Sequence, residues 1–334
     1  MNRASWLCLL LLSARAVWGQ PFQLPTANQA FFEPGGQERY FVPTPGKTWV
    51  SGTFGCVRSD GWQMHEGLDI KCLQHDRSGE PMDPVMATAD GVVAYINNRP
   101  SLSNYGRYIV LLHRIEGMEV YSLYAHLSKV QSGLRAGRAV RAGEKIAVMG
   151  RTSNTRERIS KERAHVHFEL NLFYSDHFNS WYKRHFPREH NDHGLYNGEN
   201  LVGMDARLIL LAEHEKAGRF SLLEWIGHRT ELCRVLVRRT DFPWLRRYPM
   251  LVKRGGLRPG ERAAGYEIAL DYNGLPFELT ARNAAQCKGA GKYRLLSVNE
   301  AEYAKNPCRR LVKRQGGRWV LANNGLSLLD LLTN

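Results

Sequence analysis

The sequence predicts a mainly β protein with two domains behind a short secretory leader. Its 334 residues exceed a single domain of about 150 residues. Apolar residues make up 43% and charged residues 23%, as in globular proteins, which excludes wholesale disorder and a collagen-like fibre. Between Trp49 and Leu172, short apolar runs alternate with glycines. Such runs are typical of a sandwich or a barrel.

The first 19 residues have the pattern of a signal peptide. Met1–Arg3 is positive, Trp6–Leu12 is apolar, and Ala14–Ala16 forms a small-x-small cleavage site, with Gly19 as a later alternative. A buried N-terminal helix is the competing interpretation. No apolar run approaches the roughly 18 residues that span a bilayer, so we expect no stable membrane insertion. Cys8 lacks the preceding small residue of a lipoprotein cysteine, and we therefore expect a soluble exported protein.

The chain is basic, with a formal net charge of +14 that falls by two if Arg3 and Arg15 leave with the leader. A basic exported protein suits an anionic polymer such as the cell wall, although solubility alone would also explain the charge. Arginines are scattered or paired, as in Arg238-Arg239, and form no long tract. This disfavours a nucleic-acid-binding arm.

Five cysteines would remain after export, and none forms a C-x-x-C motif. A zinc finger is therefore not expected, and an oxidising compartment favours disulfides. The nearest pairs along the chain are Cys56–Cys72 and Cys287–Cys308, which leave Cys233 over. We expect these two bridges, although spacing alone leaves other pairings open.

The chain divides into a lead-in and two larger parts. Residues 20–48 are rich in Pro, Gly and Gln and are expected to be loose. Residues 49–203 contain the short β runs and form the first predicted domain. Residues 204–334 are expected to hold two helices followed by a small β-rich domain of unknown role.

Capping and turn residues mark the expected elements of residues 204–334. Asp205 opens a helical pattern that Gly218 closes, and Ser221–Glu224 has the form of a capping box for a second helix. Farther on, Asn273-Gly274 favours a tight turn between two strands.

A histidine pair lies on a predicted strand near residue 165. Side chains of a strand alternate between faces, so Val166, Phe168 and Leu170 face one way. The other face carries His165, His167 and Glu169. A solvent-facing polar row is the plain alternative. Two such histidine rings lie about 6–7 Å apart, which favours one metal ligand and one catalytic base over two ligands of the same zinc.

A second motif, His65-Glu66-Gly67-Leu68-Asp69, supplies a histidine and a carboxylate around a glycine that suggests a turn into a strand. Together with one histidine of the pair they make two nitrogen ligands and one oxygen ligand. Three protein ligands with a fourth position open to water are typical of catalytic zinc. Another histidine, His126, shares a predicted strand face with Tyr124.

In residues 49–172 the sequence resembles the lysostaphin-type, or LytM-like, zinc metalloendopeptidases of peptidoglycan. The matching blocks occur in order: Ser51–Gly55, His65–Ile70, Pro84–Ala87, Asp90–Val93, Asn104–Gly106, Tyr124–Ser128, Val140–Glu144 and His165–Glu169.

The resemblance implies a barrel-sandwich (duplicated hybrid) domain with an antiparallel sheet and a groove. It implies one Zn²⁺ per chain, bound by His65, Asp69 and His167, with His165 and His126 as catalytic histidines. His165 is expected to be the base and His126 a hydrogen-bonding partner or acid, although the roles could be exchanged.

The implied substrate is the peptide stems of peptidoglycan, cleaved in the periplasm or cell envelope of a bacterium or after secretion. The sequence does not determine which bond is cut. Export with a cleavable leader suggests the periplasm of a diderm bacterium, where D-Ala–diaminopimelate cross-links are the usual target, whereas Gly–Gly bridges need another type of wall. One departure is the charged segment 151–164, longer than the Gly-rich loop usual in the family, which puts the cleft shape in question.

Two other functions compete with the hydrolase. A non-catalytic relative would bind the wall or activate an amidase, but such relatives usually lack ligands that this chain keeps. A carrier domain of barrel-sandwich type would also suit Asp90-Gly91-Val92, but export and the missing Met-Lys-Met hairpin argue against it.

The remaining polar candidates are expected to be structural or exposed. His113 follows an apolar run and is expected to be structural. Glu169 either orients a ligand or is a plain strand-end carboxylate. Four histidines between residues 173 and 200 are expected in a solvated loop rather than at a second metal: His177, His185, His190 and His193.

Overall fold

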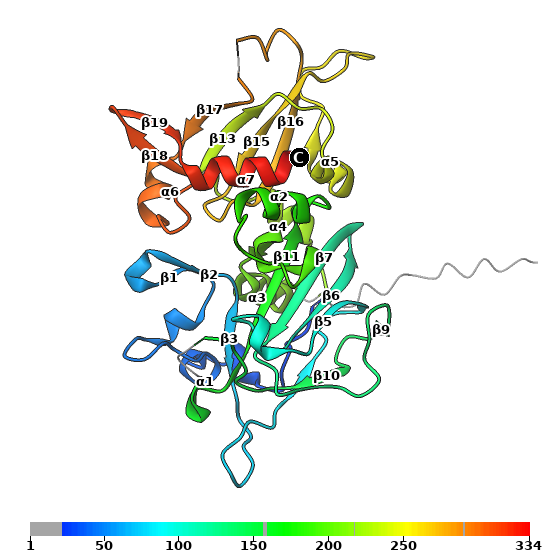
Figure 1. Cartoon of the computed structure of the whole chain (residues 1–334), viewed down its shortest axis with the longest axis vertical. Helices are drawn as coiled ribbons and strands as arrows, with labels where there is room; N and C mark the ends of the chain where they lie inside the picture. Colours follow the sequence, from blue (N-terminus) through cyan, green and yellow to red (C-terminus); the bar gives the residue numbers. More distant parts are fainter. Residues whose placement is uncertain (1–21, 156–158, 217, 290) are drawn as a thin grey trace, which may run out of the picture.

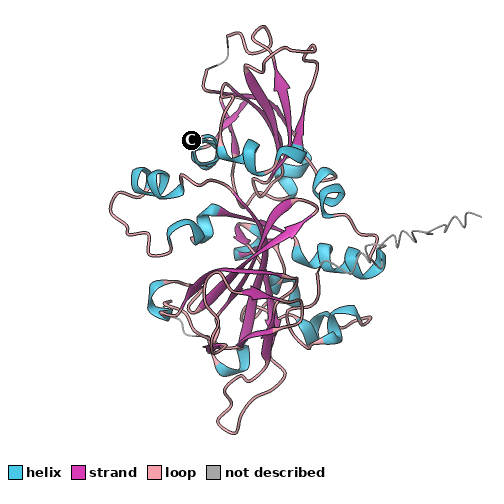
Figure 2. Ribbon diagram, turned by 90° about the vertical axis from the view of Figure 1, so that its right-hand side faces the viewer, coloured by secondary structure: helices cyan, strands magenta, loops and turns pink. Residues whose placement is uncertain are grey.

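The computed structural model describes residues 22–155, 159–216, 218–289 and 291–334. The predicted signal peptide lies outside these residues. Figures 1 and 2 show two groups of strands at the two ends of the long axis, with several helices between them. The fold is mainly β with antiparallel sheets, as the sequence predicted. Among the described helices, none has the length and apolar character needed to cross a membrane.

A seven-stranded antiparallel sheet forms the centre of the first part. Its strands follow the order β12-β11-β7-β6-β5-β9, and β3 also pairs with β11. Their bounds are β3 Leu68–Lys71, β5 Gly91–Asn97, β6 Tyr108–Ile115, β7 Met118–Ala125, β9 Ala139–Val140, β11 His165–Phe173 and β12 Leu201–Met204.

Strand β11 lies in the interior of this sheet: it pairs with β7 along one edge and with β3 and β12, in succession, along the other. All nine residues of β11 are buried. The apolar face predicted from the alternation belongs to the hydrophobic core, with Val166, Phe168 and Leu170 fully covered. The polar face is covered as well, so the solvent-facing alternative does not apply.

Two smaller sheets flank the large one. The hairpin of β1 (Gly55–Arg58) and β2 (Gln63–His65) precedes β3, and β4 (Pro84–Met86), β10 (Lys145–Val148) and β8 (Lys129–Val130) form a three-stranded sheet.

The segment before residue 49 packs onto this part instead of remaining loose. Tyr40 and Phe41 are fully buried around the short helix α1 (Gln37–Tyr40), and the Val42 amide donates to the Asp69 carbonyl. The Pro and Gly content suggested a loose segment, but Phe31, Tyr40 and Phe41 bury enough apolar surface to hold it in place.

The second part has its own five-stranded sheet, in the order β14-β16-β15-β13-β17, and a two-stranded hairpin of β18 and β19. The bounds are β13 Cys233–Val237, β14 Val252–Lys253, β15 Gly265–Leu270, β16 Pro276–Arg282, β17 Tyr293–Val298, β18 Val312–Gln315 and β19 Arg318–Leu321. Its helices are α3 Ala206–Lys216, α4 Leu222–Gly227, α5 Pro243–Arg247, α6 Glu300–Lys305 and α7 Asn323–Thr333, while α2 (Phe178–His185) belongs to the first part.

Local signals in the sequence account for several of these elements. Helix α3 follows Asp205 and ends before Gly218, and the Ser221 hydroxyl accepts a hydrogen bond from the Glu224 amide at the start of α4. Asn273-Gly274 lies in the turn between β15 and β16, where Gly274 has a φ of +91°.

The two parts are joined by a disulfide that the sequence analysis did not predict. Cys56 of β1 is bonded to Cys308, 252 residues later, with their Cα atoms 5.4 Å apart. The expected bridges Cys56–Cys72 and Cys287–Cys308 are therefore wrong, and Cys72 and Cys287 are buried free thiols. Nearness along the chain misled the prediction, because the tertiary fold brings residue 308 to β1.

Candidate metal centre

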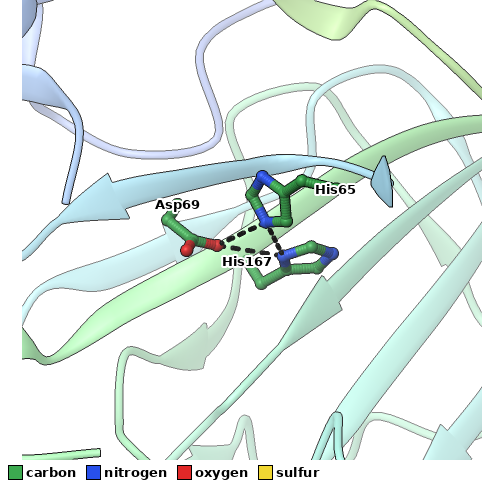
Figure 3. Close-up of side chains that lie close together, drawn as sticks. All are labelled: His65, Asp69 and His167. Atoms are coloured by element: carbon green, nitrogen blue, oxygen red, sulfur yellow. Dashed lines mark hydrogen bonds and ion pairs between the residues drawn. The ribbon is translucent and has the colours of Figure 1, made fainter. Parts of the chain in front are cut away.

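Three side chains converge beside the large sheet, as Figure 3 shows. The Asp69 Oδ1 atom lies 3.1 Å from His65 Nε2 and 3.0 Å from His167 Nδ1, and the two nitrogens are 3.2 Å apart. Ligand atoms at about 2.05 Å around a tetrahedral zinc are separated by about 3.3 Å. The donor set and its spacing therefore fit one zinc ion, and it is the one such cluster found among the described residues.

Strand pairing places these ligands. His167 of β11 is directly opposite Asp69 of β3, while His65 ends β2 and reaches the same point through the turn at Gly67. A Cβ atom on Gly67 would lie 2.4 Å from the Phe168 carbonyl oxygen and 2.9 Å from His167 Nε2. Only glycine lets this turn approach β11 so closely.

Hydrogen bonds orient both histidine ligands. His65 Nδ1 donates to the Thr53 carbonyl at 2.8 Å, which leaves Nε2 facing Asp69. His167 Nε2 donates to Glu169 Oε1 at 2.8 Å, which leaves Nδ1 for a metal. Such outer hydrogen bonds set the tautomer and the ring orientation of metal-binding histidines.

Glu169 is 1% exposed and accepts two further hydrogen bonds, from the Tyr105 hydroxyl at 2.7 Å and from Asn171 Nδ2 at 2.9 Å. Burial alone would raise the pKa of Glu169, but the hydrogen bonds, above all that from His167, lower it. Glu169 is therefore a buried carboxylate that supports His167, and not a plain strand-end residue.

Two of the ligands, Asp69 and His167, have shifted pKa values. Burial favours the neutral form of Asp69, yet the histidines around it hold the pKa of the carboxyl well below its ordinary value. Burial also lowers the pKa of His167, but its hydrogen bonds to Asp69 and Glu169 outweigh that effect and raise the pKa to about 10. A metal would therefore replace a proton on His167.

The two predicted catalytic histidines lie next to this cluster. The ring centroids of His126 and His165 are 4.8 Å apart, and His165 Nε2 is 3.5 Å from Asp69 Oδ1. Each ring donates through Nδ1 to a backbone carbonyl, His126 to Thr152 at 2.9 Å and His165 to Arg163 at 2.6 Å. Both rings therefore keep Nε2 as a potential proton acceptor.

Burial keeps these two imidazoles neutral. It lowers the pKa of His126 to about 3, with His165 and His167 adding to the effect. Burial likewise lowers the pKa of His165, although Asp69 partly opposes it. His126 also has a φ of +61°, a backbone conformation that is unusual for a non-glycine residue. The fold thus holds the ring of His126 in place through a costly backbone geometry.

Arg58 was not singled out from the sequence. Its Nη2 atom donates to Asp69 Oδ2 at 2.5 Å and lies 3.2 Å from His65 Nε2. Asp69 Oδ1 still faces the histidines. No motif reasoning could have found this arginine, because its proximity to Asp69 depends on the β1–β2 hairpin folding over β3.

Four of the other histidines have partners nearby. His113 is fully buried between the Asp90 carbonyl and the Ser122 hydroxyl, which fits the structural role expected for it. His185 contacts Asp330, and His190 contacts Asp192. His193 was expected in a solvated loop but is buried, with hydrogen bonds to the Tyr95 hydroxyl and the Leu102 carbonyl.

A cavity of about 1180 Å³ opens at the cluster. His65, Asp69, His167 and His126 line it, together with Asn154 and Thr155 of the charged segment before β11. That segment thus contributes to the cleft, as expected from its position.

Comparison with known proteins identifies the family. The model of peptidase family M23 matches residues 63–179. The lipoprotein NlpD of Yersinia enterocolitica is 34% identical over 95 residues, which cover 28% of this chain and 84% of that protein. The chain therefore belongs to peptidase family M23, whose members are generally zinc metallopeptidases.

Other relatives match over a smaller share of their length. The murein hydrolase activator NlpD of Escherichia coli is 35% identical over 128 residues, 38% of this chain and 27% of that protein. An uncharacterized metalloprotease of Haemophilus influenzae is 33% identical over 108 residues, 32% of this chain and 18% of that protein. The chain thus spans about a quarter or less of these two relatives. A zinc-containing peptidase from Vibrio cholerae is 28% identical, with a TM-score of 0.24 and coverage of 32% of this chain and 26% of that one.

Proposed function

We propose that this protein is an exported zinc endopeptidase that hydrolyses peptide cross-links of bacterial peptidoglycan. The observation that carries the proposal is the grouping of five side chains: His65, Asp69, His167 and His126 line the cavity, and His165 packs against His126 and Asp69. Three of them offer ligand atoms to one ion, and two neutral histidines keep a free nitrogen beside it. A protein that only binds the wall has no need for this second pair.

The bound zinc would lower the pKa of a water molecule toward about 7 and polarise the scissile carbonyl. His165 Nε2, near Asp69, is suited to accept the proton of the attacking water because its imidazole is neutral and its Nδ1 is held by a carbonyl. His126 is suited to hydrogen-bond the developing oxyanion or to protonate the leaving amine. Asp69 and Glu169 stay ionised and hold the ligands in place.

The sequence also supports export, through the leader pattern of its first 19 residues and the disulfide between Cys56 and Cys308. We therefore place the reaction in the periplasm or cell envelope. The relatives named as murein hydrolase activators favour a second candidate, an activator of a separate amidase. The full ligand set argues for the hydrolase over this alternative.

The test combines metal analysis with digestion of defined muropeptides, whose products are read by mass spectrometry. Asp69→Ala should lose zinc and activity. His165→Ala should keep zinc while turnover falls by about 10²–10⁴-fold, as for loss of a general base. His228→Ala, on an exposed ring after α4 that does not line the cavity, should keep both.

Two results would contradict the proposal. If Asp69→Ala and His165→Ala digest muropeptides as the unmodified protein does, the site assignment is wrong. If the zinc-loaded protein cleaves nothing but stimulates an amidase, and Asp69→Ala stimulates it equally, the protein is an activator.

A further inference from the structure

Part of the wall of the cavity at the metal centre comes from residues outside the segment that the family model matches. The C-terminal part contributes Asn273, Arg309, Leu311, Asn324, Ser327 and Leu331 to its lining. These residues follow the matched segment 63–179 by about a hundred positions or more in sequence. The C-terminal part is therefore placed to contact whatever occupies the cavity.

Covalent and polar contacts hold this wall in position. Cys308 is bonded to Cys56 of the hairpin that carries Arg58 and His65. Asn273 Nδ2 donates to the Gly203 carbonyl at 2.8 Å, which ties the turn between β15 and β16 to strand β12 of the peptidase sheet. The wall therefore belongs to the same fixed structure as the metal ligands.

Arg309 occupies the junction of the two parts. Its Nε donates to Asn273 Oδ1 at 2.8 Å, and its Nη2 lies 3.2 Å from Glu66 Oε1, on the residue after the ligand His65. The side chain is 30% exposed. Its Nη1 has no hydrogen-bond partner among the described residues, so a positively charged group that lines the cavity keeps unused donors.

A guanidinium with free donors recognises carboxylates, because its planar N–H groups match the two carboxylate oxygens. The ion pair with Glu66 and the bond to Asn273 hold the guanidinium, so little side-chain entropy is lost when a ligand binds. The nearby Arg58 is less available, since its Nη2 atom already bonds Asp69.

We infer that the C-terminal part forms one side of the substrate groove and that Arg309 determines specificity by binding a free carboxylate of an acidic peptide. This inference rests on the proposed peptidase function and names the substrate feature that the site selects. It also assigns a role to residues 204–334, which carry no motif of their own.

The test uses the full-length, zinc-loaded protein and one cross-linked peptide in two forms, with a free carboxylate near the scissile bond or with the corresponding carboxamide. The unmodified protein should have a KM about tenfold lower for the carboxylate form, as expected for a charge-assisted hydrogen bond at a partly exposed site, with similar kcat. Arg309→Gln should abolish this preference, because the KM for the carboxylate form should rise to that for the carboxamide form.

Arg310→Gln is the matched control, because Arg310 lies over Trp62, with 5.3 Å from its guanidinium carbon to the ring centroid, and does not line the cavity. It should retain the preference. Arg309→Lys keeps the charge without the planar donors and should show a reduced preference, which keeps the test informative if Arg309→Gln fails to fold.

The inference is overturned if the unmodified protein does not distinguish the two peptides, or if Arg309→Gln distinguishes them as well as Arg310→Gln does. Titration calorimetry gives the same comparison as a ratio of Kd values. If no variant hydrolyses either peptide, that result counts against the proposed function alone, while the Kd ratios still decide the role of Arg309.

Discussion

Replacing Glu169 by glutamine tests how much the negative charge of this side chain contributes to zinc binding. The carboxylate receives hydrogen bonds from His167 Nε2, Tyr105 and Asn171. An amide oxygen can still accept from His167 and Tyr105. Asn171 Oδ1 is buried without a partner among the described residues, so a rotated Asn171 amide can accept from the new NH₂ group. The variant therefore loses the charge and few hydrogen bonds.

The expected effect is weaker zinc binding with the fold intact. Loss of an outer carboxylate from a metal-binding histidine typically costs 10–100-fold in affinity. Because Glu169→Gln keeps the hydrogen bonds, we expect the lower end, about tenfold or about 1.4 kcal/mol. Glu169→Ala, which also leaves His167, Tyr105 and Asn171 without their acceptor, should approach a hundredfold.

Competition with a chromophoric chelator at pH 7.5 measures both affinities. Glu162→Gln serves as the control, since this exposed carboxylate lies shortly before β11 and should bind zinc as the unmodified protein does. Equal affinity in Glu169→Gln and the unmodified protein would refute the reasoning, as would an equal loss in Glu162→Gln.

Three further predictions concern protonation and stability. Because the pKa of His167 is raised to about 10, zinc binding near neutral pH should release about one proton, which calorimetry in two buffers of different ionisation enthalpy detects. Glu213 is buried, neither carboxylate oxygen has a partner among the described residues, and burial raises its pKa to about 7. The unfolded carboxyl loses its proton at lower pH than the folded one, so stability falls as pH rises from about 4.5 to 7. Glu213→Gln should reduce this pH-dependent decrease in the free energy of unfolding by about 1–2 kcal/mol, a value that allows for solvent screening from the adjacent cavity. Urea unfolding at several pH values measures it, and Glu215→Gln, at an exposed position, should leave the decrease unchanged. Replacing Cys56 and Cys308 by serine should lower the free energy of unfolding by about 2–5 kcal/mol, and a reductant should then have no further effect on the variant.

The candidate site could be predicted where its geometry depends on strand periodicity. The alternation in residues 165–170 placed His165, His167 and Glu169 on one face of a strand, and β11 has that arrangement. The spacing of two residues also predicted that only one histidine of the pair reaches the cluster, and of the two only His167 belongs to it. The burial of the polar face was not predictable, because it depends on segments far along the chain.

Contacts between distant segments were missed for the same reason. Local spacing suggested that Cys56 pairs with Cys72, but the fold pairs it with Cys308. Arg58 and Arg309 carry no motif, and each gains its position from a contact that crosses between elements, with Asp69 and with Glu66.

The sequence by itself determined the mainly β character of the chain and the residue types available for a metal, since a period of two sets which side chains share a face of a strand. Only the tertiary structure decided that a C-terminal wall, a disulfide and two arginines surround the ligands. Pairings over hundreds of residues follow from how whole sheets and helices pack, and local propensity carries no information about that packing.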